Sequence, residues 1–481
     1  MGRDKAFGRS GRGLSTTSVG GWLLYGPADA KNTQREGTVK KLLFGFAIAW
    51  IAAGGLSLGG AQAGPMGSEL DLGFMPASGG MEGVGIARPQ DTGSMLFGNP
   101  ATLNQFQGTT TFTFGGSYIS PQLKANGTIA VPNPANPLGP PALLPFAGKS
   151  RLQDLAAPNA SVVQRLGPNL VAAMGLTGLS GLGSDWRKVL PPSFSLIADL
   201  KLFGAGLAVA YKVNDQFSVG GTFLLGIGSL QVGTVPSSAS VNNFGIGGIF
   251  GTTYDNGLFT LSTAYKTQMR ITYNKVLITR NILDPTVTPD QALSDFTLTQ
   301  PRQVMVGLGS EKILPGTLVE VDFFWKNYSK AAGYSSFWRN QWKVAFGVQH
   351  SFTPKLKLRA GYSYSRSIVK AADQLGSTFG KVGQLFAPGF PGQLFGLEEN
   401  VAPVTPGLVQ LVQATIADGE WQQGVSVGAG YQLMPNIRVD VNFSFAYDGK
   451  VTLSDPLGSG QLINVNGKLL STGMGLTWTF R

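Results

Sequence analysis

The chain alternates apolar and polar residues in many segments of about ten residues. The clearest covers residues 437–447, where apolar side chains alternate with mostly polar ones such as Arg438 and Asp440. The same alternation occurs in residues 319–326 and 356–365. Because successive side chains of a strand point to opposite faces, the pattern predicts β-strands with one apolar and one polar face. Their length suits the roughly 9 to 11 residues that cross a bilayer as a tilted strand.

Such ribbons could form a soluble sandwich or a membrane barrel, and the leader of the chain favours the barrel. Lys40 and Lys41 precede an apolar run, residues 42–58, which ends in the small residues of 59–63. This is typical of a cleaved signal peptide, with a single membrane anchor as the alternative. We therefore expect a signal peptide at 39–63, an exported chain, and a mis-assigned or disordered extension at 1–38.

The exported part contains no second apolar run long enough for a helical span, so a membrane protein of this sequence would be a barrel. Charged residues make up only 13% of the chain, and it contains 68 Gly, 29 Phe and no Cys. Residues 64–481 keep 29 Lys and Arg against 23 Asp and Glu, a net charge of +6. This charge is too mild to indicate a nucleic-acid partner, and the lack of Cys excludes disulfides and thiolate metal sites.

Short turns alternate with longer connections along the exported chain. The short turns, each with strand signal on both sides, are 167–169, 213–216, 255–257, 314–316, 353–355 and 434–436. The longer connections lie near 120–157, 180–193, 233–242, 272–295, 328–338, 369–420 and 449–464. This asymmetry is typical of outer-membrane barrels, with tight periplasmic turns and long external loops. With an opening strand near 109–119 and a closing one near 469–480, the count is about fourteen antiparallel strands.

A barrel of about fourteen strands encloses a lumen too wide for wall side chains to fill, so it needs a plug. The segment before the first strand, residues 64–108, is Gly-rich and poor in strand signal. We therefore predict an all-β transmembrane barrel, residues 109–481, with residues 64–108 as an N-terminal hatch inside the lumen.

Part of this segment indicates a family. Residues 79–103 read GGMEGVGIARPQDTGSMLFGNPATL and resemble the hatch of the FadL/TodX long-chain fatty-acid transporters, which has a Gly-rich stretch, a D-x-x-S step and N-P-A-x-L. The stretch from 176 to 186 resembles the one after the family's third strand, and 210–220 is similar to its second tight hairpin. The matching hatch positions are Asp91, Ser94, Asn99, Pro100, Ala101 and Leu103.

The resemblance implies a monomeric barrel that takes up hydrophobic molecules, holds them beside the hatch and releases them sideways where the third strand is kinked. It places the kink within 170–179, with Gly175 and Gly178 as candidates. Because an additional stretch, 64–73, precedes the matching part, Phe74 stands in for the family's N-terminal ligand contact. The implied hatch and ligand-binding residues are Phe74, Met75, Asp91, Ser94, Phe97, Asn99, Pro100 and Ala101.

Catalytic and metal chemistry find little support in the sequence. Residues 424–428 match the G-x-S-x-G pattern, but the alternation continues through them and predicts Ser426 as a lumen-facing wall residue. His350 is the only histidine and lies near a predicted tight turn. We expect no enzyme activity, no cofactor and no metal site. The carboxylates Glu320, Asp322 and Asp440 are predicted to face the lumen, where they could set the ion preference of a pore.

The sequence therefore predicts a channel of the bacterial outer membrane for passive uptake of long-chain fatty acids or similar hydrophobic compounds. Fatty acids, aromatic hydrocarbons and alkanes all need the same apolar path. The expected partners are such molecules, outer-membrane lipids and the barrel-assembly machinery, which reads an aromatic residue such as Phe480 near the C-terminus. The alternatives are a general or small-solute porin and an adhesive surface barrel acting through the loop 371–419.

Overall fold

The computed structural model describes the exported part of the chain with several gaps. The described residues are 68–69, 72–131, 142–151, 154–181, 183–189, 197–233, 240–278, 293–335, 338–370, 422–453 and 463–480. The predicted extension 1–38, the predicted signal peptide 39–63 and the loop 371–419 lie outside them. The described residues form the barrel wall and the segment inside it.

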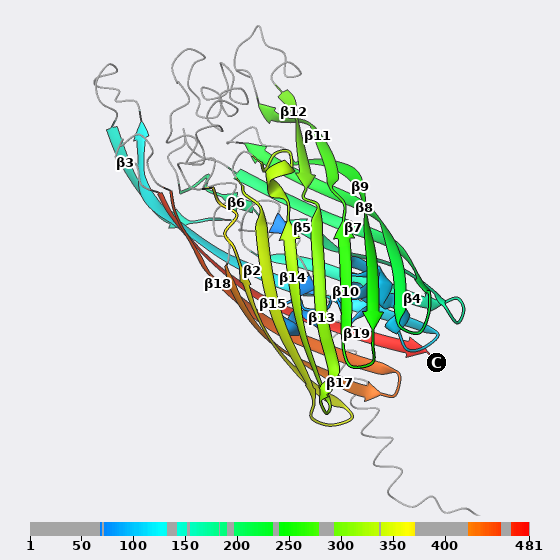
Figure 1. Cartoon of the computed structure of the whole chain (residues 1–481). Coiled ribbons are helices and arrows are strands. Elements are labelled where there is room, and N and C mark those ends of the chain that lie inside the picture. The colour runs from blue at the N-terminus through cyan, green and yellow to red at the C-terminus, as the bar shows by residue number, and fades with distance from the viewer. Residues whose placement is uncertain are drawn as a thin grey trace, which may run out of the picture. The chain divides into compact units, whose positions relative to one another are not determined.

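Fourteen antiparallel strands form a closed barrel, which confirms the predicted fold class (Figure 1). Each strand pairs with its neighbour in the chain, β10 pairs with β9, and β19 closes the ring against β2. The barrel strands are β2 (Thr110–Val131), β4 (Leu155–Arg165), β5 (Leu170–Gly181), β7 (Ile197–Lys212), β8 (Phe217–Gly233), β9 (Ser240–Asp255), β10 (Thr260–Lys266), β13 (Gln303–Leu314), β14 (Thr317–Lys326), β15 (Gln341–Ser351), β16 (Leu356–Ser365), β17 (Gln423–Met434), β18 (Ile437–Leu453) and β19 (Ile463–Phe480).

The predicted alternation sets which side chains face outward. On β18, Val441 and Phe443 are 43% and 48% exposed, whereas Asp440 between the outward positions is 1% exposed. In a barrel wall the exposed apolar positions face lipid, and the alternate positions face the lumen. All six predicted tight turns join neighbouring barrel strands at one end of the barrel (Figure 1).

Four predicted long connections contain more strand than expected, and one of them, 180–193, holds β6 (Gly183–Asp185), which pairs with β7. Residues 269–300 include a separate hairpin of β11 (Met269–Ile278) and β12 (Leu293–Gln300), where a loop from 272 to 295 was predicted. β2 extends beyond the predicted loop start and pairs there with β3 (Ala142–Lys149). β18 and β19 also run into their predicted loop. These predictions were wrong because a segment outside the membrane forms a strand when a neighbouring segment pairs with it. The sequence of one segment alone does not reveal that pairing.

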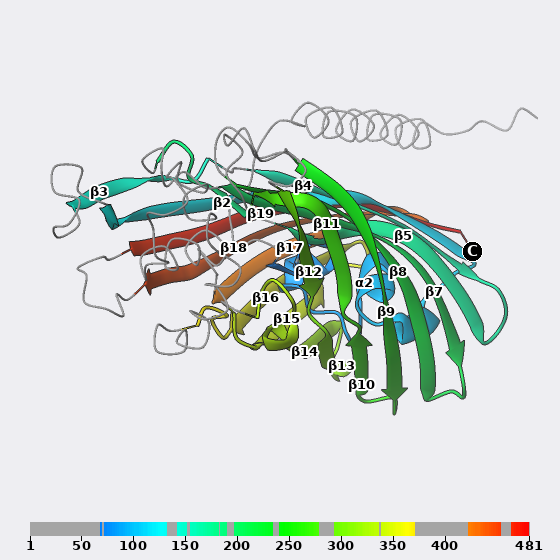
Figure 2. The same cartoon turned by 90° about the horizontal axis from the view of Figure 1, so that it is seen from above.

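Residues 72–107 lie inside the ring of strands, where Figure 2 shows α2 surrounded by the wall. This segment folds into η1 (Leu72–Phe74), η2 (Ser78–Met81), α2 (Thr92–Phe97) and η3 (Pro100–Gln105), and β1 (Ser68–Glu69) precedes it. Its predicted domain limits, 64 and 108, stay a prediction.

Glycines in the wall let the hatch backbone approach closely. A Cβ at Gly361 of β16 would lie 2.6 Å from the backbone nitrogen of Glu82, and one at Gly220 of β8 would lie 2.6 Å from that of Ala101. Any larger residue would push the hatch away from the wall. At these two positions the strand glycines make room for the hatch.

Candidate functional site

The D-x-x-S step is a structural element of the hatch. Asp91 is the N-cap of α2, and the Ser94 backbone N–H donates to its Oδ1 at 2.8 Å. Its Oδ2 accepts the backbone N–H groups of Ala77 and Ser78, both at 3.0 Å. A buried carboxylate with three donors is well satisfied, so Asp91 joins α2 to the preceding turn.

The N-P-A motif likewise caps a helical turn of the hatch, the one that follows α2. Asn99 caps η3 by accepting the Ala101 backbone N–H at 3.1 Å, and Pro100 occupies the first helical position. The Asn99 Nδ2 group donates to the carbonyl of Ile86 at 3.0 Å and to that of Thr252 on β9 at 3.3 Å. Pro suits this position because its missing N–H would have no helical partner there.

Two carboxylates of β14 hold one turn of the hatch. The backbone N–H groups of Gly85 and Ile86 donate to Asp322 Oδ2 at 2.8 and 3.0 Å. The N–H of Ala87 donates to Glu320 Oε1 at 2.6 Å, and both carboxylate side chains are fully buried. Buried carboxyl oxygens that accept several backbone N–H groups hold that backbone in place, so β14 anchors the hatch. These carboxylates face the lumen as predicted, but they bind the hatch backbone.

The neighbouring wall adds further polar anchors. Glu82 accepts hydroxyl hydrogen bonds from Ser363 and Ser444 at 3.2 and 3.1 Å, and its backbone N–H donates to Ser426 Oγ at 2.7 Å. The guanidinium of Arg438 donates to the Gln90 carbonyl at 2.7 Å. Ser426, the serine of the G-x-S-x-G pattern, is therefore a lumen-facing contact of the hatch.

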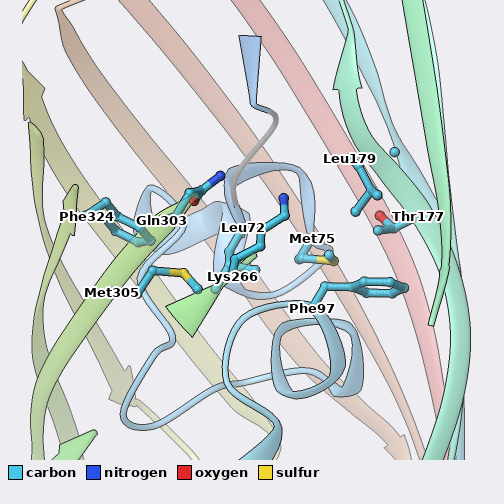
Figure 3. Close-up of a pocket in the computed structure, with 10 residues that line it drawn as sticks. Leu72, Met75, Phe97, Thr177, Leu179, Lys266, Gln303, Met305 and Phe324 are labelled. Carbon is cyan, nitrogen blue, oxygen red and sulfur yellow. The ribbon is translucent and has the colours of Figure 1, made fainter. Parts of the chain in front are cut away.

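Toward β5, β10, β13 and the end of β14, the hatch meets the wall around a small cavity, the hatch pocket (Figure 3). Most of the residues around it are buried and apolar. The hatch pocket is lined by Leu72, Met75 and Phe97 of the hatch, Thr177, Gly178 and Leu179 of β5, Lys266 of β10, Gln303 and Met305 of β13, and Phe324 of β14.

The hatch pocket is closed in this structure. The space that the centre of a water molecule can occupy is about 30 Å³. An apolar cavity that binds benzene has roughly 150 Å³. A hydrophobic ligand therefore needs side chains of the lining to move, and Leu72 and Met75 lie on or beside the short η1 segment at the start of the described hatch.

One end of the hatch pocket is polar. Lys266 ends β10, and Gln303 begins β13 as its paired neighbour. Both are buried, and the Gln303 Nε2 group has no hydrogen-bond partner within the described residues. Donors at one end of an apolar pocket suit a ligand with an oxygen acceptor at one end.

The other end of the pocket lies at an irregularity of β5. The pairing of β5 with β7 shifts register between Gly178 and Ser180. On its other side, β5 pairs with β4 only as far as Thr177, opposite Asn159. The preceding residue of β4 is Pro158, which lacks an N–H group and cannot donate to a neighbouring strand. The β4–β5 ladder thus ends beside the pocket.

Asn159 links this irregularity to the hatch. Its Nδ2 group donates to the Met75 sulfur at 2.7 Å, and its Oδ1 atom is buried without a hydrogen-bond partner among the described residues. Further along, Ser68 and Glu69 of β1 pair with Gly181 and Ser180 of β5. The first described residues of the hatch therefore lie along β5 at the point where it leaves β4.

The structure divides the predicted site residues into three groups. Met75, Phe97 and Gly178 line the hatch pocket. Gly175 lies in the regular ladder between Ser161 and Gly206, and Phe74 packs against Ile119 and its neighbours. The remaining predicted residues build the hatch: Asp91, Ser94, Asn99, Pro100 and Ala101.

Sequence reasoning missed several residues of the pocket. Lys266 and Gln303 are far apart in the chain and carry no motif, so only the closed barrel brings them to Thr177. Pro158 was a usable signal, because a proline inside a strand of alternating residues indicates an interrupted ladder.

Among the described residues, no group of three or more His, Asp or Glu side chains could hold a metal ion. No helix of the described residues has the length and apolar character to span a membrane.

The fold and the filled lumen define a class, the plugged β-barrels of the bacterial outer membrane. Residues 78–270 match the family model described as outer membrane protein transport protein (OMPP1/FadL/TodX). This match confirms, for that part of the chain, the predicted resemblance to the FadL/TodX transport proteins, and the barrel is that of a bacterial outer-membrane protein. No curated protein sequence matches the chain.

Solved structures of that group share the fold at low sequence identity. A FadL homologue of Pseudomonas aeruginosa is 16% identical, with a TM-score of 0.61 over 87% of this chain and 100% of its own. The toluene transporter TodX of P. putida is 15% identical, with a TM-score of 0.57 over 85% of this chain and 100% of its own. The toluene transporter TbuX of Ralstonia pickettii is 16% identical, with a TM-score of 0.54 over 85% of this chain and 99% of its own.

Proposed function

We propose that this barrel takes up long-chain fatty acids or similar hydrophobic compounds passively, holds them in the hatch pocket and releases them sideways beside β5. The observation that carries the proposal is the hatch pocket itself, an apolar cavity between the hatch and the register shift at Gly178. The similar structures named as toluene transporters make monoaromatic hydrocarbons a second ligand class to test.

A carboxylate ligand is favoured by the polar end of the pocket. The Lys266 ammonium can bind a carboxylate, and the Gln303 amide supplies a second donor beside it. The hydrocarbon chain would extend along Met305 and Phe97 toward Leu179, where each buried methylene contributes about 0.8 kcal/mol. A neutral hydrocarbon would use the apolar part alone.

Release requires a path from the pocket into the bilayer. The end of the β4–β5 ladder at Asn159 and Thr177 supplies a place where the wall can part without breaking strand hydrogen bonds. We propose that a ligand displaces Leu72 and Met75, together with the contact between Met75 and Asn159. The pocket then extends to this gap, and the ligand leaves sideways.

A diffusion pore, the rival hypothesis, finds less support. A porin would use Glu320 and Asp322 to attract ions, but here their oxygens accept the hatch backbone at 2.6 to 3.0 Å. The lumen is filled by buried hatch residues such as Met81, beside β15 and β16, and Leu96, beside β5. Water-filled passage needs the hatch to leave, whereas uptake through the pocket does not.

The test is the change Lys266→Met in the full-length barrel. We expect binding of a long-chain fatty acid to weaken about 10- to 100-fold, because a charge-assisted hydrogen bond is lost. Binding of toluene or of an alkane of equal length should stay the same. Isothermal titration in detergent measures both, and Lys124→Met on the exposed face of β2 is the matched control. Equal loss for charged and neutral ligands would refute a carboxylate site.

A further inference from the structure

At the end of the barrel away from the tight turns, β2 and β19 continue outward and join β3 in one external sheet. The pairing of β19 with β2 runs without a shift from Thr110 to Gly127, and β3 pairs with β2 from Lys124 to Val131. Residues directly opposite each other on neighbouring strands point to the same face of a sheet. The face that contacts lipid in the wall can therefore be followed into the external sheet residue by residue.

The outward face of β2 changes from apolar to basic along the strand. Phe112, Phe114 and Tyr118 are exposed on the lipid-facing side of the wall. Because side chains alternate, Gln122 and Lys124 continue this face, and both are exposed while the residue between them is buried. Lys124 thus lies on the same surface as the apolar wall, beyond the last aromatic residue of this strand.

Three lysines share this outward face, and we name them the lysine face. Lys149 of β3 lies directly opposite Lys124. Lys468 of β19 lies directly opposite Gln122, the outward position that precedes Lys124. All three lysines are exposed. The lysine face therefore spans three neighbouring strands and two successive outward positions.

The first of these positions lies at the level of an aromatic girdle. Phe445 of β18 is paired with Leu470 of β19, so Tyr447 and Lys468 are the next outward residues on these two strands. The Phe445 and Tyr447 rings are stacked, with centroids 5.6 Å apart. Aromatic girdles mark the membrane interface in barrels. Lys468 therefore lies at the external interface, and the other two lysines lie about 7 Å further along the strands.

The three strands that carry the lysine face hold no acidic side chain to balance it. β2, β3 and β19 contain no Asp or Glu. Within the described residues, none of the three lysine side chains forms a hydrogen bond or an ion pair. Like charges directly opposite each other destabilise a sheet, and Lys124 and Lys149 are such a pair. An anion bound between these two side chains would remove the repulsion.

We propose that the lysine face binds one anionic glycolipid of the outer leaflet at two levels. Lys468 binds a head-group phosphate at the interface, and Lys124 and Lys149 bind acidic groups on sugars further from the membrane. Ammonium groups form strong hydrogen bonds with phosphates and carboxylates, and membrane anions attract clustered lysines.

The position of the lysine face favours a lipid over a soluble anion. Apolar residues such as Phe114 and Leu470 precede the lysines on the same outward face, where acyl chains pack against the wall. A single glycolipid can therefore contact the apolar wall with its chains and the lysine face with its sugars. This inference concerns the outer surface and is independent of the ligand of the hatch pocket, which lies inside the barrel.

The test compares two lipids on the full-length barrel in neutral detergent micelles. One is diphosphorylated lipid A, and the other is lipid A extended by two acidic sugars. In the double variant Lys124→Gln and Lys149→Gln, binding of the extended lipid should weaken about 25-fold, since each Lys near a membrane anion contributes roughly fivefold. Binding of lipid A itself should stay the same in this variant. Lys468→Gln should weaken the binding of both lipids about fivefold.

The control is the double variant Lys312→Gln and Lys355→Gln, which removes two exposed charges at the tight-turn end and should bind both lipids like the unmodified protein. The unmodified protein should prefer the extended lipid, and this preference should shrink with added salt. Equal affinity of the unmodified protein for the two lipids would overturn the proposal without the need for any variant. So would equal loss of both lipids in the first double variant, or no loss of either. Displacement of the extended lipid by equimolar inorganic phosphate would also contradict it, because the site would then be one for the free anion.

Discussion

The hatch meets the barrel wall in two different ways. Toward β14 and β16 to β18 it is held by charged and polar groups, as where Asp322 accepts two backbone N–H groups. Toward β5, β10 and β13 it presents apolar side chains such as Met75 and Phe97 around a small cavity. Directional hydrogen bonds to buried carboxyl groups resist displacement, whereas side chains such as Met can change rotamer at small cost. The polar side therefore holds the hatch in place, and in the proposed function the apolar side is where a ligand would move it.

The largest effect should come from removing the polar anchor. In the double change Glu320→Ala and Asp322→Ala, the N–H groups of residues 85–88 lose their buried carboxyl partners, and each buried donor left without a partner costs about 1–3 kcal/mol. We expect the hatch to loosen and small hydrophilic solutes to leak. Planar-bilayer conductance measures this, and Glu311→Ala on β13 is the control. Unchanged conductance would mean that these contacts do not secure the hatch.

A second large effect is expected where the hatch backbone touches the wall. In Gly361→Leu, the new side chain would occupy the position of the Met81 and Glu82 backbone. The hatch backbone then cannot pack against β16 at this point. We expect the leak of small hydrophilic solutes to rise and the midpoint temperature of thermal unfolding to fall. Gly221→Leu on β8, where a Cβ has no contact closer than 3.8 Å, is the matched control. If both variants behave alike, close approach at Gly361 has no special role.

The proposed release path on the apolar side can be tested where the β4–β5 ladder ends. The change Pro158→Thr restores an N–H group to β4 where its ladder with β5 ends. We expect tighter β4–β5 pairing, slower uptake of a hydrophobic ligand into proteoliposomes by about tenfold, and unchanged equilibrium binding. Pro145→Thr on the edge strand β3 serves as the control. Uptake at the normal rate would argue against release beside β5.

The smallest effect is expected at the contact between hatch and gap. Met75→Leu keeps the apolar volume but removes the sulfur that accepts the Asn159 amide at 2.7 Å. A volume-conserving change of this kind usually costs less than about 1.5 kcal/mol. We expect ligand binding to tighten about two- to fivefold, since the closed state loses one contact. Weaker binding would show that Met75 contacts the ligand and does not restrain the pocket.

Much of the fold follows from local patterns in the sequence. The period-two alternation placed Asp440 and Ser426 toward the lumen, and the Pro- and Asn-containing turns located all six tight hairpins. Both signals depend on a few neighbouring residues, so they can be recognised in the sequence without knowledge of the tertiary structure. The hatch motif was equally local, because Asp91 and Asn99 cap the helical turns that come directly after them.

The site was decided by tertiary structure. Met75 and Phe97, predicted as hatch residues, and Gly178, predicted as a kink candidate, line the hatch pocket, but Lys266 and Gln303 join them only because the ring closes with a particular register. The same closure placed Glu320 and Asp322 against the hatch backbone, whereas alternation alone indicated only that they face the lumen. Strand faces are a property of neighbouring residues, whereas a cavity depends on which distant strands meet, and that is set by pairing and packing over the whole barrel.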